Sequence, residues 1–382
     1  MISDVDARAD DPGIDAGGVP AGARRKTARG LLAALDRWGY EERMLPAWLD
    51  YERMRPALRR FAGEGCKFIG PAGDVRLLLP DGTLGMLTLW LNGIWPVAGP
   101  VRVSYEAEVY RAVGGPWRRV RQVGAELLNV PGPAGDAEIL GAALDALQVI
   151  PGLRQQSVLN DMRITRSLAE LAVSGAGRGS TAVDDLLRAL ARGDFVALQG
   201  LLRQALSPAG AEQLWSALSF RGSVNALRDC LAGLDLDLSA SEAGTALQDL
   251  EVIVRLAAPG DPAPLIDLGM VRDLGYYDGF IFQVVVAHNG VDQIVASGGR
   301  YDSLFAGFDV QVPAAGFALD LDHLTAVAGE SEAAAPDYVL PAGPETAALA
   351  RAWSEAQRLR GQGFRVVLNP DENREGDLSA GQ

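Results

Sequence analysis

The hydrophobic pattern of the chain changes twice along its length, and these changes restrict the folds that the chain can adopt. Between residues 66 and 130, short strand-like runs alternate with turn residues such as Gly70-Pro71 and Pro80-Asp81-Gly82. From 160 to 256 the apolar residues recur at helical spacing instead, and strand-like runs return from 263 onward. Strands that are separated by turns favour an antiparallel sheet. The sequence therefore predicts an α+β fold in which a helical insertion interrupts a sheet.

Helix start signals support this organisation. Asp194 and Ser207 each precede an apolar run of helical period, and Pro208 takes a first helical position. Thr181 stands three residues before Asp184, which is an acidic variant of the capping box. We therefore expect helices to begin at these residues. The pattern predicts further helices over residues 24–38 and 136–150, near 317–324, and between two strands within 337–369.

The composition is that of a globular protein with an excess of acids. Of the 382 residues, 48% are hydrophobic and 22% are charged, and the net charge is −14. Nucleic acids and anionic membranes bind clustered cations, so this charge argues against general affinity for either. Residues 84–100 form the most apolar stretch, but they include Asn92 and Pro96 and are too few to span a membrane. We expect them to be a core segment.

Cysteine and histidine usage gives no sign of a metal site. Cys66 and Cys230 lie far apart, as is typical of reduced, buried thiols in a cytoplasmic protein rather than of a disulfide framework. The only histidines are His288 and His323, and they lack the paired spacing of zinc ligands. Residues 1–16 are acidic and polar, which predicts a disordered segment and no signal peptide.

Four segments carry side chains that could form a binding site, although each also has a purely structural interpretation. Asp81 could simply stabilise its turn, a Tyr-Tyr pair could pack at a sheet edge, and Glu126 could pair with a buried arginine. Gly298-Gly299 could make a hairpin turn, with Arg300 and Asp302 as a solvated charge pair. The candidates are Asp81 and Thr83; Arg111, Gln122 and Glu126, aimed at one side of a sheet; Arg272, Tyr276 and Tyr277; and Tyr301.

The order of these segments resembles the catalytic core of the histidyl-tRNA synthetase family, whose fold is the class II aminoacyl-tRNA synthetase core, an antiparallel sheet flanked by helices. The resemblance runs from residue 17 to 328 and weakly into 337–369. The matching motifs are Pro80-Asp81-Gly82-Thr83, Tyr110-Arg111, Gln122 with Glu126, Val271-Arg272 through Tyr276-Tyr277, and Gly298-Gly299-Arg300-Tyr301-Asp302.

In that family these positions bind histidine, and the chemistry of the side chains is consistent with this. The ammonium group of an amino acid needs anions and hydroxyls, which Asp81 and Thr83 offer, and its carboxylate needs donors such as Gln122 and Arg272. The imidazole needs a partner at each nitrogen, which Glu126 and a tyrosine of the pair can supply. The resemblance also places Tyr301 near the ring and Arg111 in the site. Arg300 and Asp302 are better explained as a structural pair.

The chain departs from the synthetase pattern where ATP and tRNA bind. Asp320 stands where the third motif has glycine, and His323 stands where it has an arginine. The loop after Arg111 lacks an acidic residue that the family uses to orient adenine, and Leu79 replaces an arginine. The carboxyl end resembles only the first strand–helix–strand of the anticodon-binding domain. The amino-acid half of the site is therefore retained, whereas the ATP and tRNA halves are degraded.

This profile is similar to that of the regulatory subunits of ATP phosphoribosyltransferase, a branch of the same family in histidine biosynthesis. The resemblance implies a cytoplasmic, non-catalytic subunit without a cofactor, which activates a short-form catalytic subunit and binds L-histidine for feedback inhibition. It also implies a homodimer within a hetero-oligomer, with no nucleic acid or membrane partner. A divergent histidine-activating ligase and a free-standing histidine-binding protein stay open as alternatives.

With this resemblance, the chain is expected to divide into seven segments. They are a disordered segment, 1–16; the first part of the class II core, 17–160; the helical insertion, 161–256; the second part of the core, 257–328; a linker, 329–336; a remnant of the anticodon-binding domain, 337–370; and a polar tail, 371–382.

Overall fold

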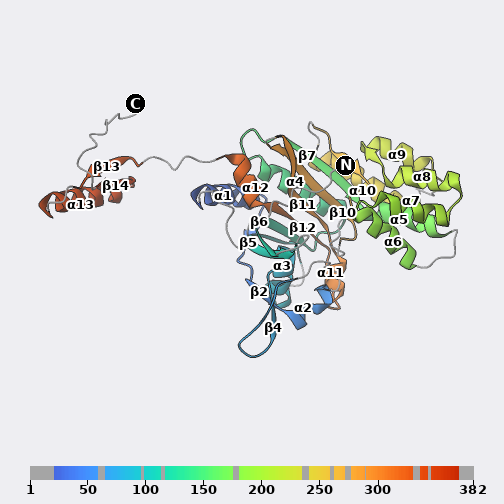
Figure 1. Ribbon diagram of the computed structural model, residues 1–382, viewed down its shortest axis with the longest axis horizontal. Coiled ribbons are helices and arrows are strands. Elements are labelled where there is room, and N and C mark those ends of the chain that lie inside the picture. The colour runs from blue at the N-terminus through green and yellow to red at the C-terminus, as the bar shows by residue number, and fades with distance from the viewer. Residues whose placement is uncertain are drawn as a thin grey trace. The chain divides into compact units, whose positions relative to one another are not determined.

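The chain divides into two compact units, residues 1–329 and residues 330–382. The segment predicted to be disordered, 1–16, and the polar tail, 371–382, lie outside the described residues, as does most of the predicted linker. The computed structural model (Figure 1) describes residues 21–58, 65–95, 99–112, 117–174, 180–234, 241–258, 262–271, 277–288, 290–329, 336–342 and 346–369.

A twisted sheet runs through the first unit (Figure 1), and its described strands follow the order β1-β5-β6-β12-β11-β10-β7-β9-β8. Most neighbours pair antiparallel, as predicted, while β1 with β5 and β7 with β9 pair parallel. The strands are β1 (Glu41–Glu42), β5 (Val101–Ala112), β6 (Trp117–Leu128), β7 (Gln155–Asp161), β8 (Arg221–Gly222), β9 (Leu265–Asp267), β10 (Phe280–His288), β11 (Val291–Arg300) and β12 (Ala314–Asp320).

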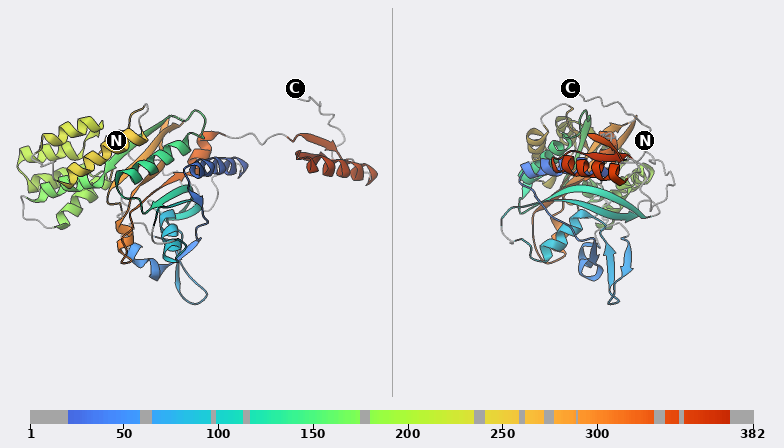
Figure 2. Two further views of the ribbon diagram at one scale, coloured as in Figure 1. Left: turned by 180° about the vertical axis from the view of Figure 1, so that it is seen from behind. Right: turned by 90° about the vertical axis from the view of Figure 1, so that its left-hand side faces the viewer.

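Helices α1 (Ala21–Arg37), α4 (Gly132–Leu147) and α12 (Leu321–Ala328) cover one face of this sheet (Figure 2). Alternate residues of β6, namely Val123, Ala125 and Leu127, are fully buried in the apolar cluster that these helices share with the sheet. The side chains between them point to the opposite face, because successive residues of a strand alternate. That opposite face carries the candidate site.

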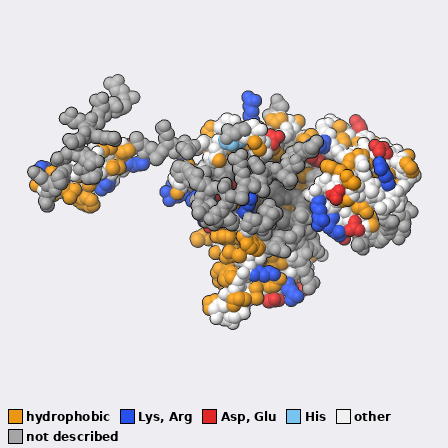
Figure 3. Space-filling view, viewed as in Figure 1, with side chains coloured by type: hydrophobic (Ala, Val, Ile, Leu, Met, Phe, Trp, Pro, Cys, Tyr) orange, Lys and Arg blue, Asp and Glu red, His pale blue; other side chains and the backbone are white. Residues whose placement is uncertain are grey.

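A smaller layer lies against the opposite face. It contains the strands β2 (Trp48–Asp50), β3 (Lys67–Ile69) and β4 (Val75–Leu78), which pair in the order β2-β4-β3, and the helices α2 (Tyr51–Leu58), α3 (Gly82–Leu91) and α11 (Ser303–Ala306). The apolar stretch 84–100 supplies most of α3, whose Leu84, Met86 and Leu87 are buried, so the predicted core segment is confirmed for residues 84–91. Beyond the helix the prediction is wrong, because Ile94 is 51% exposed. Apolar side chains also gather on the surface of this layer (Figure 3).

The predicted helical region is confirmed (Figure 2, left) and comprises α5 (Met162–Ser174), α6 (Ser180–Ala191), α7 (Phe195–Ala205), α8 (Pro208–Leu218), α9 (Val224–Ala232) and α10 (Glu242–Ala257). Asp194 caps α7 by accepting from the Ala197 N–H, and Ser207 caps α8 by accepting from the Gly210 N–H. Helix α6 begins at Ser180, one residue before Thr181, so this helix starts slightly earlier than predicted.

One strand is missed by the sequence analysis, and two expectations about local structure are wrong. The polar strand β7 was not predicted, since its sequence lacks the alternation of a half-buried strand; it is held by pairing with β10 on one side and β9 on the other. The residues after Phe317 continue strand β12, and the helix begins only at Leu321, because Asp320 caps it. Finally, Pro80-Asp81-Gly82 does not connect two strands; it leads from β4 into helix α3.

The second unit is the predicted strand–helix–strand. Strands β13 (Tyr338–Pro341) and β14 (Val366–Asn369) pair parallel, and helix α13 (Thr346–Gly361) connects them. Among its described residues, the buried apolar cluster consists of Ala356, Leu359 and Val366, with Tyr338, Leu340 and Leu368 packed against it. A core of this size is small for an independently stable domain.

Candidate functional site

The hairpin of β5 and β6 carries the first set of predicted site residues. Gln122 and Glu126 on β6 lie opposite Ala107 and Val103 on β5, and Arg111 lies four residues further along β5. Directly opposed residues of an antiparallel pair share a face, and residues four apart in a strand do so too. The prediction that Arg111, Gln122 and Glu126 share one side of the sheet is therefore confirmed.

Glu126 is the centre of a buried cluster of hydroxyl groups. Its side chain is fully buried. Its Oε1 accepts hydrogen bonds from the Thr83 hydroxyl at 2.9 Å and the Tyr105 hydroxyl at 3.1 Å. Its Oε2 accepts from the Tyr301 hydroxyl at 2.5 Å. Helix α3, strand β5 and the residue that follows β11 thus direct one hydroxyl each at the same carboxyl group.

Glycines make room for this cluster. A Cβ at Gly316, which lies opposite Glu126 on β12, would collide with the Glu126 carboxyl group. A Cβ at Gly82 or at Gly124 would collide with the ring of Tyr105. These three positions therefore exclude larger residues because the site's own side chains fill the space.

Burial sets the protonation of Glu126. Removal of the carboxyl group from water raises its pKa to about 8, the neighbouring Asp81 raises it as well, and the hydroxyl donors oppose the shift. The raised pKa favours the protonated form of Glu126 near neutral pH. Burial, with the nearby Glu126, also raises the pKa of Tyr105 and of Tyr301, so both tyrosines stay neutral donors.

Asp81 serves as a helix cap and as the partner of an arginine. Its Oδ1 accepts from the Thr83 backbone N–H at 2.8 Å, which caps α3. Its Oδ2 accepts from Arg111 Nη2 at 2.6 Å, and Arg111 Nε donates to the Pro80 carbonyl at 2.8 Å. These contacts fix the Asp81 carboxylate, and the hydrogen bond to Glu126 fixes the Thr83 hydroxyl. Together the two groups form a rigid polar edge beside Glu126.

Gln122 is buried with only 7% of its surface exposed, and its Oε1 accepts no hydrogen bond from the described part of the chain. An unpaired buried acceptor costs free energy unless a ligand or water donates to it. Gln122 therefore offers a polar contact on the same face as Glu126.

The remaining predicted residues are the tyrosines and one arginine. Tyr277 is half-buried and packs against the apolar clusters on both faces of the sheet. It lies near enough to Tyr105 and Tyr301 to contribute to the raised pKa of each. Arg272 and Tyr276 fall outside the described residues.

The double glycine before Tyr301 is part of strand β11 rather than a hairpin turn, so the hairpin interpretation is wrong. A Cβ at Gly298 would meet the Gly316 carbonyl, and one at Gly299 would meet the Phe280 carbonyl. These glycines thus allow close packing of neighbouring strands. The predicted structural pair of Arg300 and Asp302 is confirmed at 3.1 Å.

Sequence reasoning missed Tyr105, although a signal for it existed. Tyr105 lies opposite Gly124 in the β5–β6 pair, two residues from the position opposite Glu126. The alternation of Val103, Tyr105 and Ala107 would have placed it on the site face once the hairpin register was fixed.

Asp320 and His323, the two residues that depart from the third synthetase motif, interact with each other. Asp320 Oδ1 caps α12 by accepting from the His323 N–H at 3.0 Å, and its Oδ2 lies 2.8 Å from His323 Nδ1. The hydrogen bond to Asp320 raises the pKa of His323. Nearby, Arg121 is nearly buried between the carboxylates of Glu108, at 3.1 Å, and Asp322, at 3.2 Å. These contacts occupy the cation in a local ion-pair cluster.

Within the described ranges, no three histidine, cysteine, aspartate or glutamate side chains are grouped as metal ligands. Cys66 and Cys230 are free thiols, as predicted, but both are half-buried, so the expectation that they are buried is wrong. No helix among the described residues is both long and apolar enough to cross a membrane.

Comparison with known proteins identifies the class. A profile of the histidyl-tRNA synthetase family matches residues 16–324. The structure described as an ATP phosphoribosyltransferase regulatory subunit/histidyl-tRNA synthetase from Bacillus halodurans is similar with a TM-score of 0.79 at 22% identity, over 98% of this chain and 95% of that one. Histidyl-tRNA synthetase from a Nostoc species gives 0.76 at 16% identity, over 97% and 88%. The fold is that of the class II aminoacyl-tRNA synthetase core.

Sequence relatives narrow the assignment. The ATP phosphoribosyltransferase regulatory subunit of Moorella thermoacetica is 32% identical over 94% of this chain and 91% of its own length. The corresponding subunit of Symbiobacterium thermophilum is 31% identical over 92% and 90%. The chain belongs to the family of ATP phosphoribosyltransferase regulatory subunits.

Proposed function

We propose that this chain binds L-histidine beside Glu126 and acts as a non-catalytic regulatory subunit of a short-form ATP phosphoribosyltransferase. In this proposal it activates the catalytic subunit and conveys feedback inhibition by histidine. The observation that carries the proposal is the buried Glu126, held by the hydroxyls of Thr83, Tyr105 and Tyr301. A buried carboxyl of this kind suits a ligand that brings its own N–H donor, as an imidazole does.

The neighbouring groups suit the rest of an amino acid. The Asp81 carboxylate and the Thr83 hydroxyl can accept from an ammonium group, and the Gln122 Oε1 acceptor, which has no partner in the described part of the chain, can make a further polar contact. In the proposed site Arg111, Tyr277 and Tyr301 complete the surroundings, together with Arg272 and Tyr276. Histidine would enter between these groups with its ring directed at Glu126.

The region that binds ATP in a synthetase supports a non-catalytic role. A ligase needs cations to neutralise the phosphates of ATP. Here Asp320 and His323 pair with each other, and Arg121 is held between Glu108 and Asp322. An additional carboxylate at this place repels polyphosphate, and the local arginine is already engaged.

Reconstitution tests the regulatory role. We expect the chain to co-purify with a short-form ATP phosphoribosyltransferase catalytic subunit, to raise that subunit's activity, and to make it sensitive to histidine. The chain alone should catalyse no histidine-dependent exchange between ATP and pyrophosphate. Such exchange would instead favour the histidine-activating ligase, and binding of histidine without any effect on the catalytic subunit would favour a free-standing binding protein.

Calorimetric titration of histidine tests the pocket. Glu126→Ala should weaken histidine binding by about 1–3 kcal/mol, since it leaves polar groups without a buried partner. The matched control is Glu251→Gln, which alters an arginine-paired glutamate on helix α10. Equal affinities for wild type and Glu126→Ala would remove Glu126 from the proposed site.

A further inference from the structure

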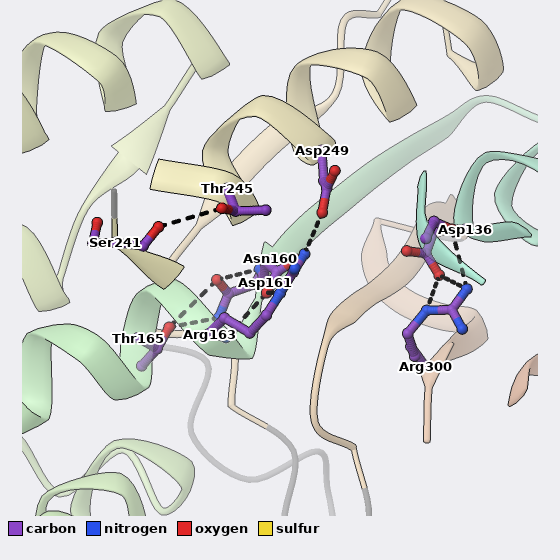
Figure 4. A network of polar contacts seen from close by, with 10 residues as sticks. Asp136, Asn160, Asp161, Arg163, Thr165, Ser241, Thr245, Asp249 and Arg300 are labelled. Atoms are coloured by element: carbon purple, nitrogen blue, oxygen red, sulfur yellow. Dashed lines mark hydrogen bonds and ion pairs between the residues drawn. The ribbon is translucent and has the colours of Figure 1, made fainter. Parts of the chain in front are cut away.

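A network of buried polar side chains lies next to Tyr301 in the chain (Figure 4). Arg300, the residue before Tyr301, is 8% exposed and lies against Asp136 of helix α4, which is 1% exposed. Arg300 Nε donates to Asp136 Oδ1 at 2.8 Å, and Arg300 Nη2 lies 2.7 Å from the same oxygen. The guanidinium also donates to the carbonyls of Val130 and Gly132 at 3.2 Å. Arg300 is thus fixed at each of its nitrogens.

A second part of the network connects the sheet to the helical region. Asp161, the fully buried last residue of β7, accepts from Arg163 Nε at 2.9 Å and from Nη2 at 2.7 Å. The same Nη2 donates to Asp249 of helix α10 at 2.8 Å. Arg163 therefore connects the sheet to α10 through two carboxylates, as the dashed lines in Figure 4 show.

The two parts lie close together. Asp161 is opposite Phe280 on β10, and the next residue, Ile281, is opposite Gly299 on β11, which directly precedes Arg300. The charges of Asp161 and Arg163 both act on the Asp136 carboxyl group, together with that of Arg300. Buried charges on neighbouring strands interact even without a direct hydrogen bond, because little water screens them.

Ligand binding would act on one end of this network. Tyr301 donates its hydroxyl to Glu126 Oε2. A histidine ring N–H that approaches Glu126 Oε2 must share that oxygen with the Tyr301 hydroxyl. Bound histidine would therefore alter the hydrogen bond between Tyr301 and Glu126. Its neighbour Arg300 cannot shift without changing its bonds to Asp136.

We propose that Arg300 and Asp136 are positioning residues for Tyr301, and that Arg163 and Asp249 extend their effect to helix α10, so that histidine in the pocket is sensed by the helical region. This inference rests on the proposed binding of histidine. It requires that binding change the network's contacts, because coupling between two sites is a free-energy difference between two arrangements.

A pair of variants on one helix tests the inference. Asp249 and Glu251 both lie on α10 and both accept from an arginine, but only Asp249 belongs to the network. We would measure histidine affinity by calorimetry and the hydrogen exchange of α10 with and without histidine, in wild type, Asp249→Asn and Glu251→Gln. Thermal unfolding of each variant without histidine gives the control for simple loss of stability.

In wild type and in Glu251→Gln, histidine should slow amide exchange in α10. In Asp249→Asn that response should disappear, and histidine affinity should fall about 5-fold or more. If Asp249→Asn does not fold, Arg163→Lys serves instead, because it keeps the charge and loses the forked geometry. As a further readout, Arg300→Lys should retain more of the α10 response than Arg300→Met.

The outcomes separate the two proposals. If wild type does not bind histidine, the proposed function fails, and this inference fails with it. If wild type binds histidine but exchange in α10 does not change, or if Asp249→Asn keeps the full response, only the inference is overturned.

Discussion

A buried carboxyl group is sensitive to pH in a direction that its environment fixes, and Glu126 gives a clear example. Its pKa is raised from 4.5 to about 8 in the folded protein. Between these two values the folded state binds more protons than the unfolded state, so the free energy of unfolding must fall as the pH rises.

We therefore predict that the stability of wild type decreases from pH 5 to pH 8 more steeply than that of Glu126→Gln, which has no proton to lose. The difference in slope should be at most ~1.4 kcal/mol per pH unit. Urea unfolding at a series of pH values measures it. Asp136 also has a raised pKa, of about 7, and contributes to the pH dependence of both proteins. The difference between the two slopes, rather than the wild-type slope alone, therefore reports on Glu126. Parallel curves would contradict the shifted pKa of Glu126.

The glycine opposite Glu126 provides a second prediction at this scale. Gly316→Ala should destabilise the fold by about 1–3 kcal/mol and weaken histidine binding, because the added Cβ occupies the place of the Glu126 carboxyl group. Gly200→Ala is the control, since a Cβ there meets no neighbour and Gly200 is in the interior of helix α7. It should stabilise by about 0.5–1 kcal/mol. Denaturant unfolding of both variants decides the matter, and equal effects would refute the steric explanation.

Individual residues were predictable where their chemistry was unusual. A glutamate flanked by apolar residues indicated a special position, and Arg300 with Asp302 indicated a pair. Tyr105 was missed because a tyrosine in a strand is ordinary until the register of its neighbour is known. The cap made by Asp81 was missed because a Pro-Asp-Gly-Thr sequence suits both a turn and a helix start.

At the scale of elements, the helix caps are the clearest signals that the sequence contains. Asp194→Ala should cost about 1 kcal/mol, because the Ala197 N–H loses the acceptor that begins α7. Glu212→Ala, at an exposed position in α8, should change stability by less than about 0.5 kcal/mol. Chemical denaturation compares the two, and a similar small effect for both would mean that the cap is not needed.

Strands were harder to predict than helices, for a physical reason. Helices depend on contacts within about four residues, so periodicity and caps reveal them. Strand β7 contains Gln155, Gln156, Ser157 and Asn160, and it is a strand only because β9 and β10 lie beside it. Strand β12 is buried between β6 and β11, and its run of small and apolar residues fits a helix equally well by pattern alone.

At the scale of the whole molecule, the division of the chain into two units leads to a prediction about truncation. All residues of the two large apolar clusters precede residue 330. A protein that ends at Gly329 should therefore keep its melting temperature within a few degrees and its affinity for histidine. The isolated segment 330–382, whose described residues form only a small buried apolar cluster, should show no cooperative thermal transition. Calorimetric scans test both expectations. Cooperative unfolding of the isolated segment would contradict the inference that its apolar cluster is too small for independent folding.

The order of the large segments was predictable because a change of hydrophobic period over tens of residues is robust to local errors. The pairing of distant strands was not, since β6 meets β12 across nearly two hundred residues of intervening chain. Only the resemblance to a known family supplied that arrangement before the structure did.

The two half-buried thiols have a practical consequence. Cys66 lies beside strand β3, in the layer on the pocket face, and Cys230 lies in helix α9 of the helical region. Burial raises the pKa of the Cys230 thiol, which slows its reaction with maleimides. A donor and an acceptor dye could therefore be attached in sequence to the natural cysteines. Energy transfer between them would report any movement of the helical region as ligand is added, without a single engineered residue.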